Sequence, residues 1–293
     1  MKRIWNNKNY IVSRATAFTG SAYAMLGFVG TLVPLDECLP NSMSMLMRVI
    51  ISVAVLICVW LISFIGATLY VLCKNRICVL SANNGHALYL QYGDLFSAEE
   101  VANPDTRRNI VIPVNRCFDT HVDNQIVSEQ TLHGMTLKRL YSSGMFTEES
   151  LYSLIETRLL QEKYENLSRS DKPAGKLKRY PVGTIVDVTG VDGEHYFLWA
   201  LSTFDSNLKA HTTMQDYTLA VQKLIEACNS ESEGFPIVLP LVGTGLSRIK
   251  KDQCDVLRYL ISAFRLNKAE INSDIHIIIR EELKDEIAIM SIK

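Results

Sequence analysis

The sequence lacks the cysteine and charge patterns that mark several common protein classes. Its seven cysteines are scattered, with no Cys-x-x-Cys pair and no histidine at metal-ligand spacing from any of them. An odd, dispersed set of this kind favours a reducing compartment over a disulfide framework, and it indicates no metal site. The formal net charge of −1 argues against a nucleic-acid partner.

Signals for catalysis and for cofactors are missing as well. No histidine–cysteine or histidine–serine–acid combination stands out, so nucleophilic catalysis has no support from the residues. The chain also has no internal repeat and no low-complexity tract. We therefore expect a protein that is not an enzyme and that holds no cofactor.

Hydrophobicity, by contrast, is concentrated in two runs near the N-terminus. Residues 15–35 and 49–73 are runs of 21 and 25 residues without a charge. As helices they would measure ~32 Å and ~37 Å, enough to cross a hydrocarbon core of ~30 Å. The first run is diluted by threonine, serine and glycine. A cleaved signal peptide is the alternative there, but a second span follows at once and no small-x-small cleavage site does.

The charges that flank the two runs predict the orientation of the protein in a membrane. Six basic residues lie on the outer sides of the pair: Lys2, Arg3, Lys8, Arg14, Lys74 and Arg76. The linking loop contains Asp36 and Glu37 against Arg48 alone. The positive-inside rule then places both termini in the cytoplasm. We expect a multi-pass cell-membrane protein with a transmembrane hairpin, residues 1–76, and a cytoplasmic domain, residues 77–293.

After the second run the pattern alternates between strands and amphipathic helices. The predicted strands span residues 77–81, 87–92, 109–115, 183–189, 196–203, 236–242 and 276–280. The predicted helices span residues 147–164, 212–228 and 252–266. Residues 165–180 are polar and basic, and we interpret them as a surface loop whose lysines are solvated. The alternation predicts a three-layer α/β domain with a mixed sheet.

The segment 235–248, FPIVLPLVGTGLSR, gives the clearest indication of a binding site. An apolar strand leads into Gly-Thr-Gly at 243–245, and a helix begins a few residues later. Ligands of open α/β sheets lie beyond the carboxyl ends of strands, where glycine N–H groups and a helix N-terminus favour an anion. Ser247 and Arg248 could add further donors. A tight strand-to-helix turn is the alternative interpretation.

Two earlier strands also end in polar segments, Gly-Asp-Leu at 93–95 and Asn-Arg-Cys-Phe-Asp-Thr at 115–120. Taken in chain order with the Gly-Thr-Gly segment, these motifs resemble those of the macro domain, an ADP-ribose-binding fold. The resemblance implies that Asp94 holds the adenine amino group and that Asn115 faces the distal ribose. It also implies that the backbone amides of residues 242–246 surround the pyrophosphate.

One part of the macro-domain pattern is missing. Where the family has a second asparagine and a run of three glycines, residues 116–134 contain Gly134 as their single glycine. Family members that hydrolyse ADP-ribose from proteins tend to depend on that run, so its loss argues against hydrolysis. We call this segment, residues 116–134, the first loop. Its greater length could instead accommodate a group attached to the distal ribose.

The whole layout resembles the transmembrane-macro effectors of type II Thoeris anti-phage defence. The resemblance rests on the hairpin, on Phe-Asp-Thr at 118–120 and on Ser-x-x-x-Leu-His-Gly at 128–134. It implies that a TIR-domain enzyme consumes NAD and makes an ADP-ribose derivative, such as a histidine adduct. The macro domain would sense this signal, and a homo-oligomer would then disrupt the lipid bilayer and kill the cell. Two alternatives stay open, a membrane-tethered ADP-ribosyl hydrolase and a non-catalytic anchor that recruits a partner.

The resemblance implies a ligand-binding set drawn from all three strand ends. Phe118 could stack on a base or ribose, or it could belong to the core; Asp119 and Thr120 could face the ligand or close the loop. The expected ligand-binding residues are Asp94, Leu95, Asn115, Phe118, Asp119, Thr120, Val242, Gly243, Thr244, Gly245, Leu246, Ser247 and Arg248.

Overall fold

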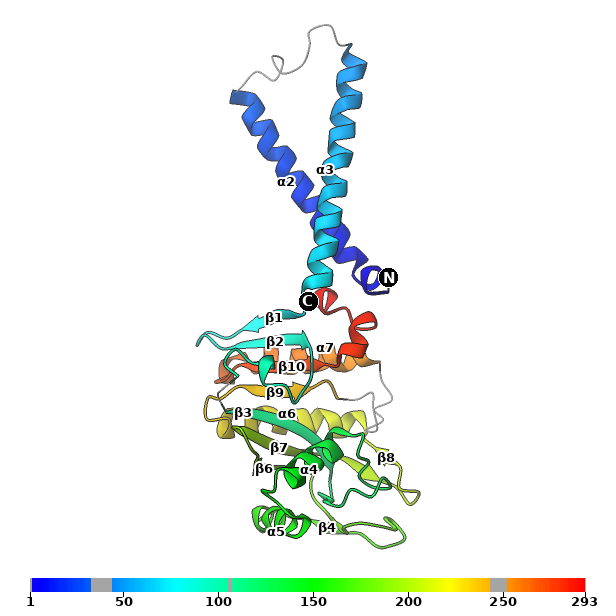
Figure 1. Cartoon of the computed structure of the whole chain (residues 1–293), viewed down its shortest axis with the longest axis vertical. Helices are drawn as coiled ribbons and strands as arrows, with labels where there is room; N and C mark the ends of the chain where they lie inside the picture. Colours follow the sequence, from blue (N-terminus) through cyan, green and yellow to red (C-terminus); the bar gives the residue numbers. More distant parts are fainter. Residues whose placement is uncertain (1, 33–43, 105–106, 243–251, 293) are drawn as a thin grey trace. The chain divides into compact units, whose positions relative to one another are not determined.

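The computed structural model describes residues 2–32, 44–104, 107–242 and 252–292. The chain divides into two compact units, one formed by residues 1–75 with 282–293 and the other by residues 76–281 (Figure 1). The first boundary lies within one residue of the expected one. Residues 282–293, which we expected in the α/β domain, group with the N-terminal helices instead.

The helical unit contains α1 (Lys2–Asn6), α2 (Lys8–Leu32) and α3 (Met45–Cys73). Helix α3 begins after Ser44, whose side chain accepts the N–H of Met47 at 3.4 Å. Its mean hydropathy reaches 2.8, and it is long and apolar enough to cross a membrane. Within the described part of the chain it is the one helix that meets this criterion. Helix α2, which contains most of the first expected span, does not meet it.

Polar residues of α2 make contacts with α3 inside this unit. The Oγ1 atom of Thr16 accepts a hydrogen bond from the indole Nε1 of Trp60 at 3.2 Å. The hydroxyl of Tyr23 donates to the carbonyl of Ser52 at 2.9 Å. The residues that lower the hydropathy of α2 therefore include ones that join it to its neighbour, as polar residues do between helices in lipid.

The N-terminal helix and the C-terminal residues are also tied into the helical unit. Arg3 donates from Nη2 to the carbonyls of Val71 and Lys74, at 2.9 and 3.0 Å, where a positive charge is favourable beside the end of α3. Asn6 donates from Nδ2 to the carbonyl of Asp285 at 2.8 Å. The chain thus leaves this unit after α3 and returns to it at its C-terminal end.

The α/β unit is built on an eight-stranded mixed sheet with the order β1-β2-β10-β9-β3-β7-β6, and β8 pairs with β7. Strands β2, β10, β9, β3 and β7 are parallel, whereas β1, β6 and β8 are antiparallel to their neighbours. The strands are β1 (Arg76–Ser81), β2 (Ala87–Tyr92), β3 (Arg108–Asn115), β6 (Ile185–Thr189), β7 (Glu194–Phe204), β8 (Ala210–His211), β9 (Ile237–Pro240) and β10 (Ile275–Ile279).

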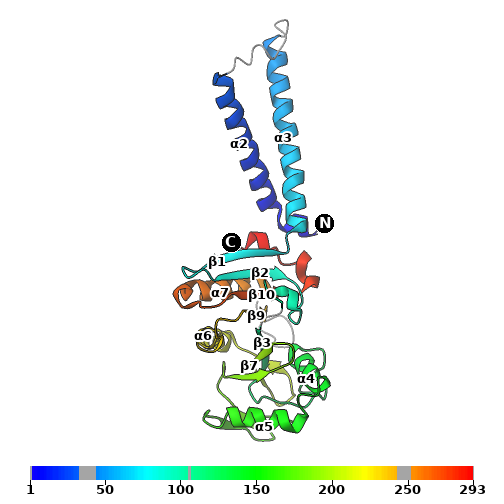
Figure 2. The same cartoon turned by 60° about the vertical axis from the view of Figure 1, so that its left-hand side comes forward.

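Helices cover both faces of this sheet, with α6 and α7 on one side and α4 on the other (Figure 2). The helices are α4 (Leu132–Ser142), α5 (Glu148–Arg158), α6 (Met214–Glu231) and α7 (Gln253–Leu266). Because strand side chains alternate, Tyr196 and Leu198 of β7 join the core cluster that includes residues of α4 and α5. Trp199 instead donates from Nε1 to the carbonyl of Ala220 on α6, at 3.1 Å. The predicted α/β fold with a mixed sheet is confirmed.

Most predicted elements of the α/β unit lie within about three residues of their expected bounds, and three features differ. Helix α4 was not predicted. Helix α5 starts after the expected Thr147, which forms a capping box with Ser150, but it ends at Arg158 and not at residue 164. Residues 165–180 are not wholly irregular, because β4 (Glu165–Asn166) and β5 (Lys178–Arg179) form an antiparallel ribbon.

Candidate functional site

The carboxyl ends of β2, β9 and β3 lie at one edge of the sheet because these strands are parallel. Asp94 and Leu95 follow β2, Val242 follows β9, and Asn115 ends β3. The structure therefore brings these predicted segments to the same edge. The predicted residues Gly243, Thr244, Gly245, Leu246, Ser247 and Arg248 lie outside the described residues.

Asp94 is exposed on the turn after β2, and internal hydrogen bonds fix that turn. Its Oδ1 accepts the N–H of Phe96 at 3.1 Å, and its own N–H donates to Oε1 of Glu100 at 2.9 Å. Leu95 is buried and belongs to the hydrophobic core cluster. Of these two predicted residues, Asp94 is thus the one that presents its side chain to solvent.

Gly93 lies directly against the end of the Glu100 side chain. A Cβ built on Gly93 would lie 1.9 Å from Oε1 of Glu100. The Glu100 side chain has little freedom to move away, because the amide of Gln91 donates to both its Oε2 and its backbone carbonyl. The Gly-Asp pair at the end of β2 therefore has a packing reason in this chain, independent of any resemblance.

Asn115 ends β3 as a buried residue whose side chain turns the chain out of the strand. Its Oδ1 accepts the N–H of Cys117 at 3.0 Å. The next residue, Arg116, donates from Nε to the carbonyl of Tyr180 at 2.8 Å. The first loop is therefore bonded at its start to the segment that leads into β6.

Phe118 lies in the core in this structure. Its backbone has a φ of +49°, and its ring packs edge-on against Tyr180 with 5.8 Å between the ring centroids. The side chain is 1% exposed, so neither ring face is open to a base or a ribose. Of the two roles that the sequence left open, the structure shows the core one.

Asp119 is also engaged inside the protein. Its Oδ2 lies 2.5 Å from Nζ of Lys172, and its Oδ1 accepts the N–H of Lys176 at 2.6 Å. Both members of the ion pair are buried, with side chains 1% exposed for Lys172 and 5% for Asp119. The prediction that the lysines of 165–180 are solvated is therefore wrong for Lys172. Asp119 instead joins the first loop to that segment.

Lys176 shares this interior region. Its Nζ lies 4.1 Å from the ring centroid of Tyr152 and finds no hydrogen-bond acceptor among the described residues. Burial lowers the pKa of this ammonium to about 8, which makes its charge labile near neutral pH. The sequence did not predict that Lys172 and Lys176 point into the protein, because nothing in a polar segment shows which of its side chains are buried.

Two further contacts hold the first loop from the side of α4. The hydroxyl of Tyr141 donates to the carbonyl of Thr120 at 2.6 Å, and Thr120 is itself buried. His133, in the first turn of α4, is also buried. The first loop is thus bonded to α4 as well as to the 165–180 segment, so its shape is set by long-range contacts.

Because two histidines are buried, we expect the free energy of unfolding to fall in acid. Burial lowers the pKa of His133 to about 3 and that of His276 to about 4, from an ordinary value near 6.5. At a pH between the folded-state pKa of each histidine and its ordinary pKa near 6.5, the unfolded chain binds a proton at that histidine and the folded chain does not. The stabilisation is therefore complete above about pH 6.5 and is lost as the pH falls, by up to about 1.4 kcal/mol per pH unit for each histidine.

Denaturant unfolding measured at pH 7, 6 and 5 checks this expectation. The midpoint should fall with pH in the unchanged protein, and less steeply in His133→Gln. An unchanged slope in that variant would remove His133 as a cause.

Two similarities to known proteins bear on this site. Residues 88–280 match the model of a family described as "Thoeris protein ThsA, Macro domain". The chain is also similar to the Thoeris protein ThsA of Bacillus amyloliquefaciens (strain Y2), with 26% identity over 219 residues, which covers 72% of this chain and 69% of that protein. The family match includes all three strand ends of the candidate site.

Proposed function

The chain belongs to the ThsA family of Thoeris proteins through its macro domain, and from this premise we propose that it is a membrane effector of anti-phage defence. Its macro domain senses an ADP-ribose-derived signal, such as histidine–ADP-ribose made by a TIR-domain enzyme. Ligand binding then triggers membrane disruption and cell death. Activity of this kind requires a ligand that binds two states of the protein with different affinities.

The observation that carries this proposal is the arrangement of the three strand ends. Exposed Asp94 and buried Asn115 flank the end of β9, which continues into the Gly-Thr-Gly sequence. An acidic side chain at one end suits an adenine amino group, and backbone N–H groups of a glycine loop suit a pyrophosphate. The ADP-ribose therefore lies along this edge, with the adenine toward β2 and the distal ribose toward β3.

The helical unit is the membrane-active part. We place α3 across the bilayer and α2 beside it as a second crossing, with both termini in the cytoplasm. The basic residues that flank the pair support this orientation. The hydrogen bonds from Trp60 to Thr16 and from Tyr23 to Ser52 support two adjacent helices. Assembly of several copies in the membrane follows as the step that damages the bilayer.

A chain of hydrogen bonds inside the α/β unit offers a route from the ligand to the tether, the two residues Lys74 and Asn75 that join α3 to β1. Glu100 accepts the N–H of Asp94 and binds the amide of Gln91. Gln91 in turn accepts from Nε of Arg76 at 2.7 Å, and Arg76 also donates to the carbonyl of Glu100. Arg76 is the first residue of β1, three positions after the end of α3 at Cys73. A shift of the Asp94 turn thus acts on the residue next to the tether.

Dye-filled vesicles that contain the full chain test the proposed function. Addition of ADP-ribose or histidine–ADP-ribose should release the dye, and vesicles without the protein should stay intact. If no ligand of this class released dye at concentrations that saturate the protein, the membrane step of the proposal would be wrong.

A flexible insertion in the tether tests the transmission step. A short Gly-Ser segment placed between Asn75 and Arg76 should leave ligand affinity unchanged and largely abolish dye release, because the strand end no longer constrains α3. The same segment inserted after Gly144, in the exposed turn between α4 and α5, is the matched control and should leave release intact. Full release with the tether insertion would contradict direct transmission.

The membrane-tethered hydrolase is the second candidate. It shares the binding site but needs turnover, and residues 116–134 lack the glycine run on which hydrolytic family members tend to depend. We therefore propose that the protein is not an enzyme. Incubation with an ADP-ribosylated protein separates the two candidates, since release of ADP-ribose above background would favour the hydrolase.

A further inference from the structure

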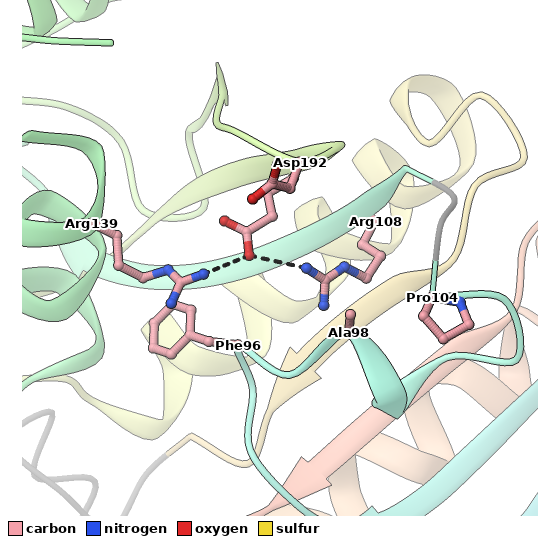
Figure 3. A pocket seen from close by; sticks show the side chains of 7 residues that line it. Phe96, Ala98, Pro104, Arg108, Arg139 and Asp192 are labelled. Atoms are coloured by element: carbon pink, nitrogen blue, oxygen red, sulfur yellow. Dashed lines mark hydrogen bonds and ion pairs between the residues drawn. The ribbon is translucent and has the colours of Figure 1, made fainter. Parts of the chain in front are cut away.

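A cavity lies at the opposite end of strand β3 from Asn115. It has a volume of about 580 Å³, and its lining includes Arg108 and Glu194, the first residues of β3 and β7 (Figure 3). These two residues are direct partners in the parallel register. Seven residue steps along a strand amount to ~23 Å, so the cavity lies far from Asn115, whereas Phe96 and Ala98 of its lining follow Asp94 by two and four residues.

The buried carboxylate of Glu194 forms part of the cavity wall. Glu194 Oε1 accepts hydrogen bonds from Nη2 of Arg108 at 3.0 Å and from Nη2 of Arg139 at 2.8 Å. Its Oε2 accepts from the hydroxyl of Tyr196. Figure 3 shows the guanidinium groups of Arg108 and Arg139 pointing toward each other across the cavity. With three donors, this carboxylate is fully satisfied.

Arg108 has donor groups that Glu194 does not use. The residue is 3% exposed, and its Nε and Nη1 have no acceptor among the residues that the structure describes. A buried donor without an acceptor is costly, and such groups in native proteins usually mark a site for something else. Arg139 stacks over Phe96, 5.0 Å from the ring centroid, which holds its guanidinium at the cavity.

The lining contains two arginines and two acidic residues, but the two guanidinium groups are not paired one to one with carboxylates. They share one buried carboxylate, and the other acidic residue of the lining, Asp192, is exposed and therefore solvated. Arginine side chains bind oxyanions through parallel N–H groups. Arg108 is buried, and the side chain of Arg139 is 44% exposed, so a ligand can reach the pair from the solvent side of Arg139. Because the two arginines come from different elements, β3 and α4, they suit an anion with oxygens on several sides.

We propose that this cavity is a second ligand site, which binds a phosphate group through Arg108 and Arg139. The phosphate group could be free phosphate or part of a phosphomonoester. Because the volume of the cavity exceeds that of a single phosphate, it also has room for a phosphomonoester such as a nucleoside monophosphate. The lining of this site shares no residue with the proposed ADP-ribose edge, and its ligand stabilises the α/β unit by binding the folded state alone.

Thermal unfolding of the full chain in nanodiscs tests the proposal. All samples carry Gly245→Glu, so that phosphate at the glycine loop does not contribute. Potassium phosphate is titrated against potassium chloride at constant ionic strength and pH, and AMP is titrated in parallel. The unfolding midpoint of the α/β unit should rise with phosphate by a few degrees, and stabilisation by AMP at lower concentration would identify a phosphomonoester as the ligand.

The variant Arg108→Gln should lose the phosphate-dependent shift. Its matched control is Arg107→Gln, one residue away, because Arg107 pairs with Glu233 at 2.8 Å and is not part of the cavity lining. Where Arg108→Gln does not fold, Arg139→Gln should reduce the shift at least severalfold. Two results would overturn the proposal: no phosphate-specific rise in the midpoint, or the same rise in a folded arginine variant as in the protein with both arginines. Either would show that Arg108, Arg139 and Glu194 form a structural triad only.

Discussion

Replacement of Gly245 by glutamate should weaken the binding of ADP-ribose-type ligands to the full chain by roughly a hundredfold or more, which is about 3 kcal/mol. The proposed pyrophosphate contact needs the backbone N–H groups of residues 243–247 to approach the ligand closely, and a side chain at 245 obstructs that approach. The added carboxylate also repels the pyrophosphate, since a like charge in a contact costs several kcal/mol. Calorimetric titration of the full chain in nanodiscs with ADP-ribose and histidine–ADP-ribose measures the loss.

The matched control for this experiment is Leu266→Glu. It adds the same charge at the end of α7, on a side chain that is 88% exposed, so its affinity should equal that of the unchanged protein. Retained affinity in Gly245→Glu would remove the glycine loop from the site. No binding by the unchanged protein would overturn the sensing function as a whole.

Replacement of Lys172 by methionine should lower the free energy of unfolding of the α/β unit by about 3–5 kcal/mol. The change keeps the length of the side chain but leaves the carboxylate of Asp119 buried without its cation. Nζ and Oδ2 are 2.5 Å apart, and both side chains are almost fully buried, so water cannot take the place of the ammonium. Denaturant unfolding of the full chain measures the loss.

Two further variants separate an unpaired charge from a general packing defect. Lys163→Met removes an exposed lysine just before the 165–180 segment and should change stability by less than about 0.5 kcal/mol. The double variant Lys172→Met with Asp119→Asn should recover much of the stability, because the isolated charge is gone. A double variant as unstable as the single one would show that the cost arises from packing.

The framework of the α/β unit follows from local patterns. Strand β3 is buried along its length, as a continuous apolar run between turn signals predicts, and β2 and α7 were found within one residue of their expected bounds. The N-cap Thr147 was also predicted from the sequence, and Asp252, predicted as the first residue of a helix, is the N-cap of α7. These features depend on residues that are neighbours in the chain, so a single sequence contains them.

Helix α4 was missed because its signal depends on contacts outside the helix. Gly134 stands in its first turn and lowers its helix propensity. A Cβ there would lie 2.1 Å from the carbonyl oxygen of Ser128, so the glycine serves the close approach of the preceding loop. The site was incomplete for the same reason. Asp119 and Lys172 are 53 residues apart, and no local pattern links them.

The return of residues 282–293 to the helical unit makes the macro domain an insertion within that unit. Its first strand, β1, and its last, β10, lie on the two sides of β2, so this unit is entered and left two strands apart. A domain with adjacent ends can be exchanged without stretching the chain that surrounds it. If residues 76–281 act as the proposed sensor, they form a replaceable cassette, and a different ligand-binding domain with closely spaced ends should place the same helices under the control of another signal.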